Sequence, residues 1–219
     1  MLLSIADVLT PDDVTTVCET LKRAVFLDGR TTAGWSARLV KANLQADVDP
    51  DVERTRKMVE DRLRANPVFM LATLPKRIVG PNFSKYTRGD TYGTHVDDAI
   101  MDGVRTDVAF TLFLSAPDSY DGGELIIETA AGEEAIKLPA GSMVAYPCTS
   151  LHRVAEVTRG ERLAAVGWVR SLIRDAARRE ALFDLETARR RLFDREGKSA
   201  EFDLLSKTSA NLMRMWCED

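Results

Sequence analysis

The chain has little of what would place a protein outside the cell, in a membrane or on a nucleic acid. Its three cysteines are odd in number and widely scattered, which predicts reduced thiols in a reducing compartment. No apolar run approaches the ~20 residues that a membrane span requires, and the N-terminus lacks the basic region of a signal peptide. A net charge of −4 argues against non-specific nucleic-acid binding. We therefore expect a cytoplasmic protein that binds neither membranes nor nucleic acids.

Histidine is also rare, and the chain contains only His95 and His152. Residues two apart in a strand share one face, so the His95 imidazole and the Asp97 carboxylate would point the same way. His152 begins another strand-like run that could lie antiparallel beside the first. Two histidines and one carboxylate, with open positions left over, form the ligand set of non-haem Fe(II) oxygenases. The alternative is that each histidine is an ordinary core or surface residue, but together the residue types and their spacing favour a metal site.

An arginine follows at a useful distance from the second histidine. Arg162 comes directly after the turn at Arg159-Gly160-Glu161, so its strand could pair with the strand that His152 begins. The planar guanidinium group is suited to binding a carboxylate through two hydrogen bonds. The sequence therefore predicts an anion-binding arginine close to the metal site.

The predicted secondary structure changes along the chain and divides it into three segments. Residues 1–76 contain two predicted helices, which begin at Thr10-Pro11 and at Asp49-Pro50, and a candidate strand over 35–42. Residues 77–171 contain short β-prone runs separated by turns, which favours a barrel or a two-sheet jelly roll. The expected strands are 78–86, 108–115, 124–129, 134–138, 142–146, 152–157 and 163–169.

Residues 172–219 are expected to form a charged helical tail that contains no histidine and takes no part in the chemistry. The tail has too many apolar side chains to leave in water on a helix, so they must cover the β-core, a second subunit, or both. These apolar positions are Leu182, Phe183, Leu185, Leu192 and Phe193.

The sequence segments around these residues resemble those of a known protein family. The stretches 83–97 (FSKYTRGDTYGTHVD), 105–115, 120–125 (YDGGEL), 146–154 and 158–165 are similar to the Fe(II)/2-oxoglutarate-dependent dioxygenase superfamily, and to its prolyl-4-hydroxylase-like branch in particular. The ending at 209–216 (SANLMRMW) resembles the tail of the bacterial PKHD-type hydroxylases, a group linked by name to iron uptake. The resemblance covers nearly the whole chain.

This resemblance implies a mainly β protein, with a double-stranded β-helix (jelly roll) core, N-terminal helices and a C-terminal helical tail. It implies Fe(2+) held by His95, Asp97 and His152, with 2-oxoglutarate as co-substrate, O2 as oxidant and ascorbate as reductant. Arg162 would bind the far carboxylate of 2-oxoglutarate. Tyr86 would donate a hydrogen bond to the same molecule, or would be a core aromatic residue with a wet hydroxyl.

The implied activity is a hydroxylase that couples decarboxylation of 2-oxoglutarate to succinate with oxygen insertion into an unidentified small-molecule or protein substrate. Related halogenases lack the carboxylate of Asp97, so its presence favours hydroxylation. A homodimer is also implied. One alternative is a non-catalytic module of the same fold that senses iron or 2-oxoglutarate, although the complete triad and Arg162 favour catalysis. Another is a cupin-like metal protein, which would usually add a glutamate and a further histidine.

Overall fold

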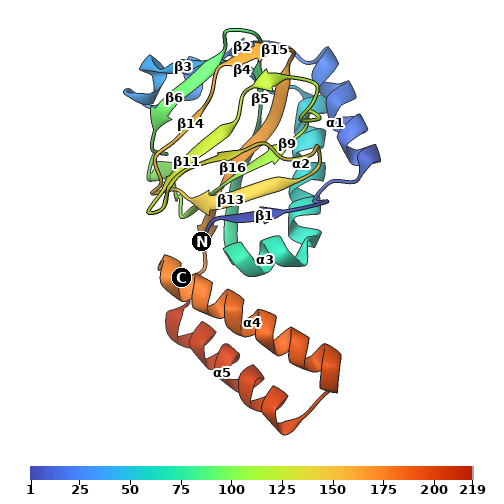
Figure 1. The fold of residues 1–219 in the computed structure, drawn as a ribbon, viewed down its shortest axis with the longest axis vertical. Coiled ribbons are helices and arrows are strands. Elements are labelled where there is room, and N and C mark those ends of the chain that lie inside the picture. The colour runs from blue at the N-terminus through green and yellow to red at the C-terminus, as the bar shows by residue number, and fades with distance from the viewer. Residues whose placement is uncertain (219) are drawn as a thin grey trace.

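The computed structural model describes residues 1–218 and consists of two β-sheets, helices packed on the larger sheet, and a C-terminal helical hairpin (Figure 1). The helices are α1 (Pro11–Arg23), α2 (Pro50–Ala65), α3 (Pro67–Thr73), α4 (Ala176–Glu196) and α5 (Ala200–Trp216), with short 3-10 turns at Gly29–Thr32 and Ala37–Leu39. None of the helices in the described chain is both long enough and apolar enough to cross a membrane.

The strands form a jelly roll, as the sequence predicted. The seven-stranded sheet has the order β1 (Leu3–Ile5), β13 (Met143–Pro147), β9 (Val108–Phe113), β16 (Arg162–Ser171), β5 (Pro75–Tyr86), β4 (Leu44–Ala46) and β2 (Phe26–Asp28). The five-stranded sheet has the order β12 (Gly132–Ile136), β11 (Leu125–Thr129), β14 (His152–Val154), β6 (Thr91–His95) and β3 (Lys41–Ala42). Two ribbons pair β7 (Ile100–Met101) with β8 (Val104–Arg105), and β10 (Asp121–Gly122) with β15 (Val157–Arg159).

The central strand β9 shows how the core is divided. All of its residues are buried, because both faces of the seven-stranded sheet are covered. Phe110 and Leu112 pack into a cluster with residues of α1, α2 and α3 on the outer face. Ala109 and Phe113 point the other way, into a second cluster shared with the five-stranded sheet. The alternation of the strand therefore places one set of side chains under the helices and the other set beside the space between the sheets.

The starts of the first two helices follow the predicted capping chemistry. The Thr10 hydroxyl accepts a hydrogen bond from the Asp13 backbone N–H, and the Asp13 carboxylate accepts one from the Thr10 N–H, which completes a capping box. Asp49 caps α2 in a similar way by accepting hydrogen bonds from two backbone N–H groups. Asn66 ends α2 as expected, but its side chain also caps α3, a short helix that the sequence analysis did not predict.

The predicted strand over 35–42 is wrong for most of its length. Trp35 is 81% exposed, and the chain forms a 3-10 turn at Ala37–Leu39 before it reaches β6. Only Lys41 and Ala42 form a strand, which pairs with β6. The N-terminal segment nevertheless contributes to both sheets: β3 joins the smaller sheet, and β1, β2 and β4 join the larger one.

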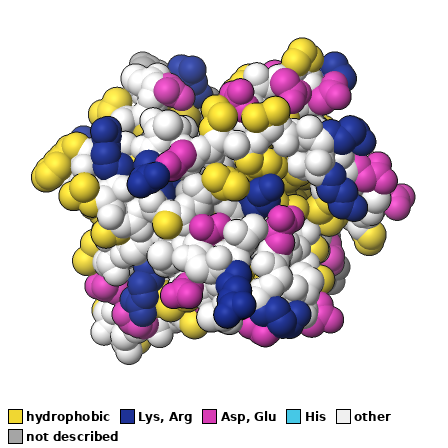
Figure 2. All heavy atoms as spheres, turned by 90° about the horizontal axis from the view of Figure 1, so that it is seen from above, with side chains coloured by type: hydrophobic (Ala, Val, Ile, Leu, Met, Phe, Trp, Pro, Cys, Tyr) yellow, Lys and Arg dark blue, Asp and Glu magenta, His cyan; other side chains and the backbone are white. Residues whose placement is uncertain are grey.

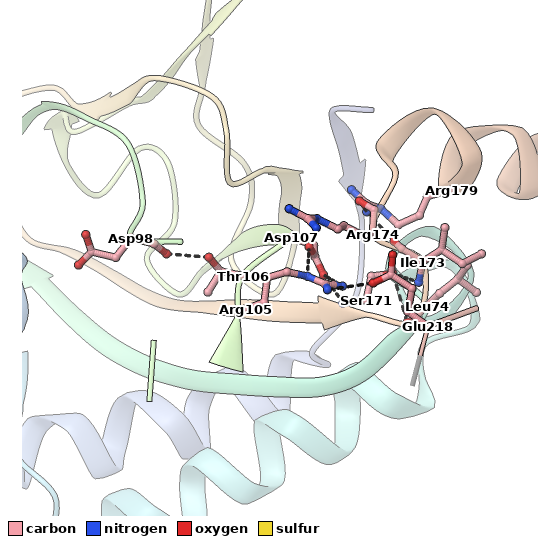
Figure 3. A network of polar contacts seen from close by, with 10 residues as sticks. All are labelled: Leu74, Asp98, Arg105, Thr106, Asp107, Ser171, Ile173, Arg174, Arg179 and Glu218. Atoms are coloured by element: carbon pink, nitrogen blue, oxygen red, sulfur yellow. Dashed lines mark hydrogen bonds and ion pairs between the residues drawn. The ribbon is translucent and has the colours of Figure 1, made fainter. Parts of the chain in front are cut away.

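The tail forms an antiparallel pair of helices that extends away from the sheets (Figure 1). Leu182 is buried near the start of α4, whereas Phe193 is 48% exposed near its end and contacts the ring of Phe202 on α5. The hairpin is fastened where β16 ends: Asp107 accepts hydrogen bonds from Arg105 and from the Ser171 backbone, and Arg105 also contacts Glu218 (Figure 3). The hairpin therefore covers the core at its base and leaves apolar side chains exposed further out.

Deletion of residues 172–219 is expected to cause aggregation or a change of oligomeric mass. The deletion removes Leu182 and Ile173 from buried positions and uncovers the surface beneath them. Size-exclusion chromatography with light scattering, together with thermal unfolding, measures both effects. Leu204→Glu serves as a milder companion because this side chain is exposed and its replacement should leave the fold intact. A truncated protein that stays soluble with its native mass and thermal stability would contradict a packing or subunit-contact role for the tail.

Candidate metal centre and its cavity

A cavity of about 670 Å³ is lined by residues of both sheets. All five residues that the sequence predicts as ligands or binding groups line this cavity. They are His95, Asp97 and His152 of the proposed metal site, and Tyr86 and Arg162 from strands β5 and β16. The volume lies within the range of small-molecule sites in proteins. The structure therefore brings the predicted site residues into one enclosed space.

His95, Asp97 and His152 converge at one point of this wall. Strands β6 and β14 are antiparallel neighbours, and their register sets His95 directly opposite His152, with ring centroids 4.2 Å apart. The Nε2 atom of His152 lies 3.9 Å from Oδ1 of Asp97. One ligand atom from each residue lies within 4.8 Å of the others. This separation suits three ligands arranged around a single metal ion.

Asp97 joins the cluster, but it does not share a strand face with His95 as the spacing predicted. Strand β6 ends at His95, and Asp97 lies in the loop that follows, so the two side chains do not share a strand face. The loop is held instead by Thr106, whose hydroxyl donates a hydrogen bond to the Asp98 carbonyl at 2.7 Å and whose N–H donates to the Ala99 carbonyl (Figure 3). A tethered loop thus does the positioning that strand alternation was expected to do.

Hydrogen bonds fix the tautomer of both imidazoles. The Nδ1 atom of His95 lies 2.8 Å from the Gly93 carbonyl oxygen, and Nδ1 of His152 lies 3.1 Å from that of Ser150. A carbonyl oxygen can only accept, so each Nδ1 carries the hydrogen and each Nε2 keeps a free lone pair. Hydrogen bonds of this kind orient metal-binding histidines in proteins.

Burial shifts the pKa values of two of the three proposed metal ligands. It lowers the pKa of His95 to about 3, with the charge of His152 adding to the effect, so the imidazole is neutral at physiological pH. Burial also raises the pKa of Asp97, which the neighbouring His152 and, to a lesser extent, Trp168 partly offset. The buried Oδ2 atom of Asp97 has no hydrogen-bond partner in the described chain. Two imidazole rings and a carboxylate with an unpartnered oxygen fit a divalent metal, whose charge would compensate for the burial of Asp97.

Arg162 is the largest fully buried side chain and is only 1% exposed. Its Nε and Nη2 atoms have no hydrogen-bond partner among residues 1–218, while its guanidinium lies 5.1 Å from the ring of Tyr86 and 5.5 Å from that of Phe113. Aromatic faces support a cation but leave its N–H groups unsatisfied. A buried cation with free donors that lines a cavity is suited to an anionic ligand.

Tyr86 lies directly opposite Arg162 in the β5–β16 pairing. Its side chain is buried, and burial raises the pKa of Tyr86 to about 12. The phenol therefore keeps its proton and can donate a hydrogen bond to a ligand beside Arg162. The ring of Tyr86 belongs to the core cluster between the sheets, as one alternative predicted, but its hydroxyl is buried and not in contact with bulk water. Its hydrogen bond to 2-oxoglutarate stays a prediction.

The predicted hairpin between the strands of His152 and Arg162 is wrong. Strand β14 belongs to the five-stranded sheet, and β16 pairs with β5 and β9 in the other sheet. The run expected over 152–157 breaks into β14 and β15, and β15 pairs with β10. His152 and Arg162 thus reach the cavity from different sheets.

Three further residues of this site are outside the ligands and binding groups that the sequence predicts. Lys41 and Trp168 both line the cavity, and Tyr92 stacks on the His95 ring with centroids 3.6 Å apart. Strand alternation from Arg162 places Trp168 on the same face, so this signal was available in the sequence. Lys41 gave no such signal, because its segment was predicted as a longer strand.

Comparison with known proteins identifies close relatives. A family model described as the 2OG-Fe(II) oxygenase superfamily matches residues 81–170. The chain is 52% identical to a PKHD-type hydroxylase of Picosynechococcus sp. over the whole length of both proteins. It is 51% identical to a PKHD-type hydroxylase of Rippkaea orientalis, with 99% of each chain covered.

Solved structures share the fold at lower identity. A Pseudomonas putida prolyl-4-hydroxylase superposes with a TM-score of 0.59 and 22% identity, covering 78% of this chain and 92% of that one. HygX from Streptomyces hygroscopicus, crystallised with nickel and 2-oxoglutarate, superposes with a TM-score of 0.55 and 15% identity, covering 78% and 84%. These likenesses support the jelly-roll assignment.

Proposed function

This chain belongs to the PKHD-type hydroxylases of the 2OG-Fe(II) oxygenase superfamily, and we propose that His95, Asp97 and His152 hold the Fe(II) of this 2-oxoglutarate-dependent hydroxylase. The observation that carries the proposal is the convergence of three ligand atoms within 4.8 Å, with both Nε2 lone pairs free. A facial set of this composition leaves coordination positions for co-substrate and oxygen.

Arg162 and Tyr86 are proposed to hold the end of 2-oxoglutarate that lies away from the metal. The unpaired Nε and Nη2 atoms of Arg162 can donate to a carboxylate, and the protonated Tyr86 hydroxyl can add a further hydrogen bond. Since Arg162 is buried, water competes poorly for that carboxylate. These residues would orient the co-substrate with its keto-acid end toward the metal ligands.

The chemistry of oxygen activation is supplied by Fe(II) together with 2-oxoglutarate and O2 when they are bound. The chain contributes position and shielding. Tyr92 packs flat on the His95 ring and limits its rotation, and Trp168 lines the cavity with Asp97. Buried side chains such as Tyr86, Tyr146 and Arg162 limit the access of water to the inner part of the cavity, which protects a reactive site from side reactions.

The substrate is proposed to be a protein side chain, a free amino acid or a siderophore-related small molecule. The last option follows from the similarity of the tail to proteins linked by name to iron uptake. Ascorbate is proposed as the reductant that keeps iron in the divalent state. The substrate class and the reductant are both more specific than the hydroxylase activity that the relatives indicate.

The proposed function is tested by incubating iron-loaded protein with 2-oxoglutarate, ¹⁸O2 and cell extract, with and without ascorbate. We expect succinate to form and one extract component to gain a single ¹⁸O atom, detected by mass spectrometry. Omission of ascorbate should reduce the number of turnovers before the enzyme stops. The matched control is Asp97→Ala, which should abolish both products. Succinate formation that is equal in this variant would disprove the ligand assignment.

A further inference from the structure

We propose that Lys41 binds a carboxylate group of the substrate that is hydroxylated, beside the metal ligands. The inference rests on the proposed function and narrows the substrate to molecules that carry a carboxylate. It concerns a residue that has no part in holding iron or in the 2-oxoglutarate contacts described above.

The position of Lys41 places it at the metal end of the cavity. Lys41 lies opposite Tyr92 in the pairing of β3 with β6, and its Nζ atom lies 5.0 Å from the centre of the Tyr92 ring. The same ring stacks on His95, with the two centroids 3.6 Å apart. Lys41 also lines the cavity. Its ammonium group is thus separated from a metal ligand by a single aromatic ring.

The ammonium group is buried without an acidic partner. Lys41 is only 7% exposed, and its Nζ donates one hydrogen bond, to the Thr32 hydroxyl at 3.2 Å. Within residues 1–218 no carboxylate oxygen forms an ion pair with Nζ within 4.0 Å; Asp28 and Asp97 act on it only from further away, and Asp28 is bound by Arg30. An ammonium group has three N–H donors, so two remain available. A buried cation without a counter-charge is costly, and an anion in the cavity would remove that cost.

The lysine is held in place before any ligand arrives. The Thr32 hydroxyl that accepts from Lys41 also contacts the side chain of Gln45, a buried residue of β4. The cation–π contact with Tyr92 fixes the other side of the ammonium group. Burial lowers the pKa of Lys41 to about 8, which still leaves most of the group charged at pH 7. The site is therefore preorganised to meet an anion.

Charge balance indicates which molecule supplies that anion. A divalent iron would be balanced by Asp97 and the keto-acid end of 2-oxoglutarate, and Arg162 would balance the other end. Lys41 is then the buried cation that these partners leave without a counter-charge. The remaining charged side chains on the cavity wall are exposed or paired, so they are screened by water or by each other. These side chains are Glu53, Arg56, Lys57, Glu60, Asp98 and Asp102.

The test uses protein loaded with Zn(II) and 2-oxoglutarate, which binds without turnover. The probes are propionate, butanoate and hexanoate, each compared with its primary amide by saturation-transfer NMR. We expect each acid to bind about tenfold more tightly than its amide, as one charge-assisted hydrogen-bonded contact allows. Lys41→Met should remove this preference, and Lys41→Arg should retain most of it.

The control is Lys85→Met, because Lys85 also lies over an aromatic ring, that of Phe26, but lies outside the cavity. This variant should keep the preference for acids. The affinity for 2-oxoglutarate is measured in every variant. Intact 2-oxoglutarate binding in Lys41→Met with loss of the acid preference supports the proposal. Absence of acid binding in the wild type, equal binding of amides, or a preference that survives Lys41→Met overturns it.

Two further results separate this inference from the proposed function. Loss of 2-oxoglutarate affinity in Lys41→Met would assign the lysine to the co-substrate and overturn the substrate role. Failure of the wild-type protein to bind Zn(II) or 2-oxoglutarate would instead overturn the proposed function on which the inference rests. A fall in acid binding without loss of thermal stability distinguishes a ligand contact from a structural one.

Discussion

His152→Ala should lose stoichiometric Fe(II) binding while the jelly roll remains folded. The substitution removes one of three ligand atoms from the cluster, and changes even to the partners of such ligands cost roughly 10–100-fold in metal affinity. We therefore expect a loss of at least about 100-fold for the ligand itself. Anaerobic equilibrium dialysis measures bound iron, and circular dichroism follows the fold.

The fold should survive because the His152 ring faces the cavity. Its side chain packs beside Tyr146 and His95, both of which also line that space, so its removal enlarges an existing cavity. Asp98→Asn is the matched control, since Asp98 adjoins Asp97 but has no place in the ligand cluster. Full iron affinity in His152→Ala, or an equal loss in Asp98→Asn, would show that the ligand assignment is wrong.

Features of the fold that depend on residues close together in the sequence could be predicted. The capping box at Thr10 and the Asp49 cap involve contacts within a few residues, so their chemistry is visible in the sequence. Most strands of the β-core were located because turns separate them. The strand predicted over 35–42 failed because strand formation also needs a partner, and pairing with β6 begins only at Lys41.

The candidate site shows the same limit. His95, Asp97 and His152 were selected by residue type, and the structure gathers them, but by a different route from the one expected. A hydrogen bond from Thr106 holds the loop that contains Asp97. The alternation of side chains along a strand cannot predict such a contact. Lys41 becomes significant only when β3 pairs with β6 and brings it over Tyr92. Its role depends on a contact between segments that are distant in the sequence.

Arg162→Lys should raise the apparent KM for 2-oxoglutarate by about tenfold or more, with Fe(II) binding unchanged. Lysine keeps the positive charge but replaces the planar fork with a single ammonium group, so a two-point contact with a carboxylate is lost. Steady-state succinate formation at varied 2-oxoglutarate gives the KM, and equilibrium dialysis gives the iron affinity. Arg153→Lys is the control, because Arg153 adjoins His152 but pairs with Glu133 on the surface.

Arg162→Met separates function from stability. The guanidinium is buried with unpaired Nε and Nη2 atoms, so an apolar side chain of similar length removes a desolvated charge. The ligand-free protein should then be as stable as the wild type or more stable, by up to about 1–4 kcal/mol in the free energy of unfolding. Its 2-oxoglutarate binding should nevertheless be lost. Denaturant unfolding and calorimetric titration measure the two quantities. A strongly destabilised Arg162→Met protein, or a variant that still binds 2-oxoglutarate normally, would place the carboxylate contact elsewhere and make Arg162 a structural residue.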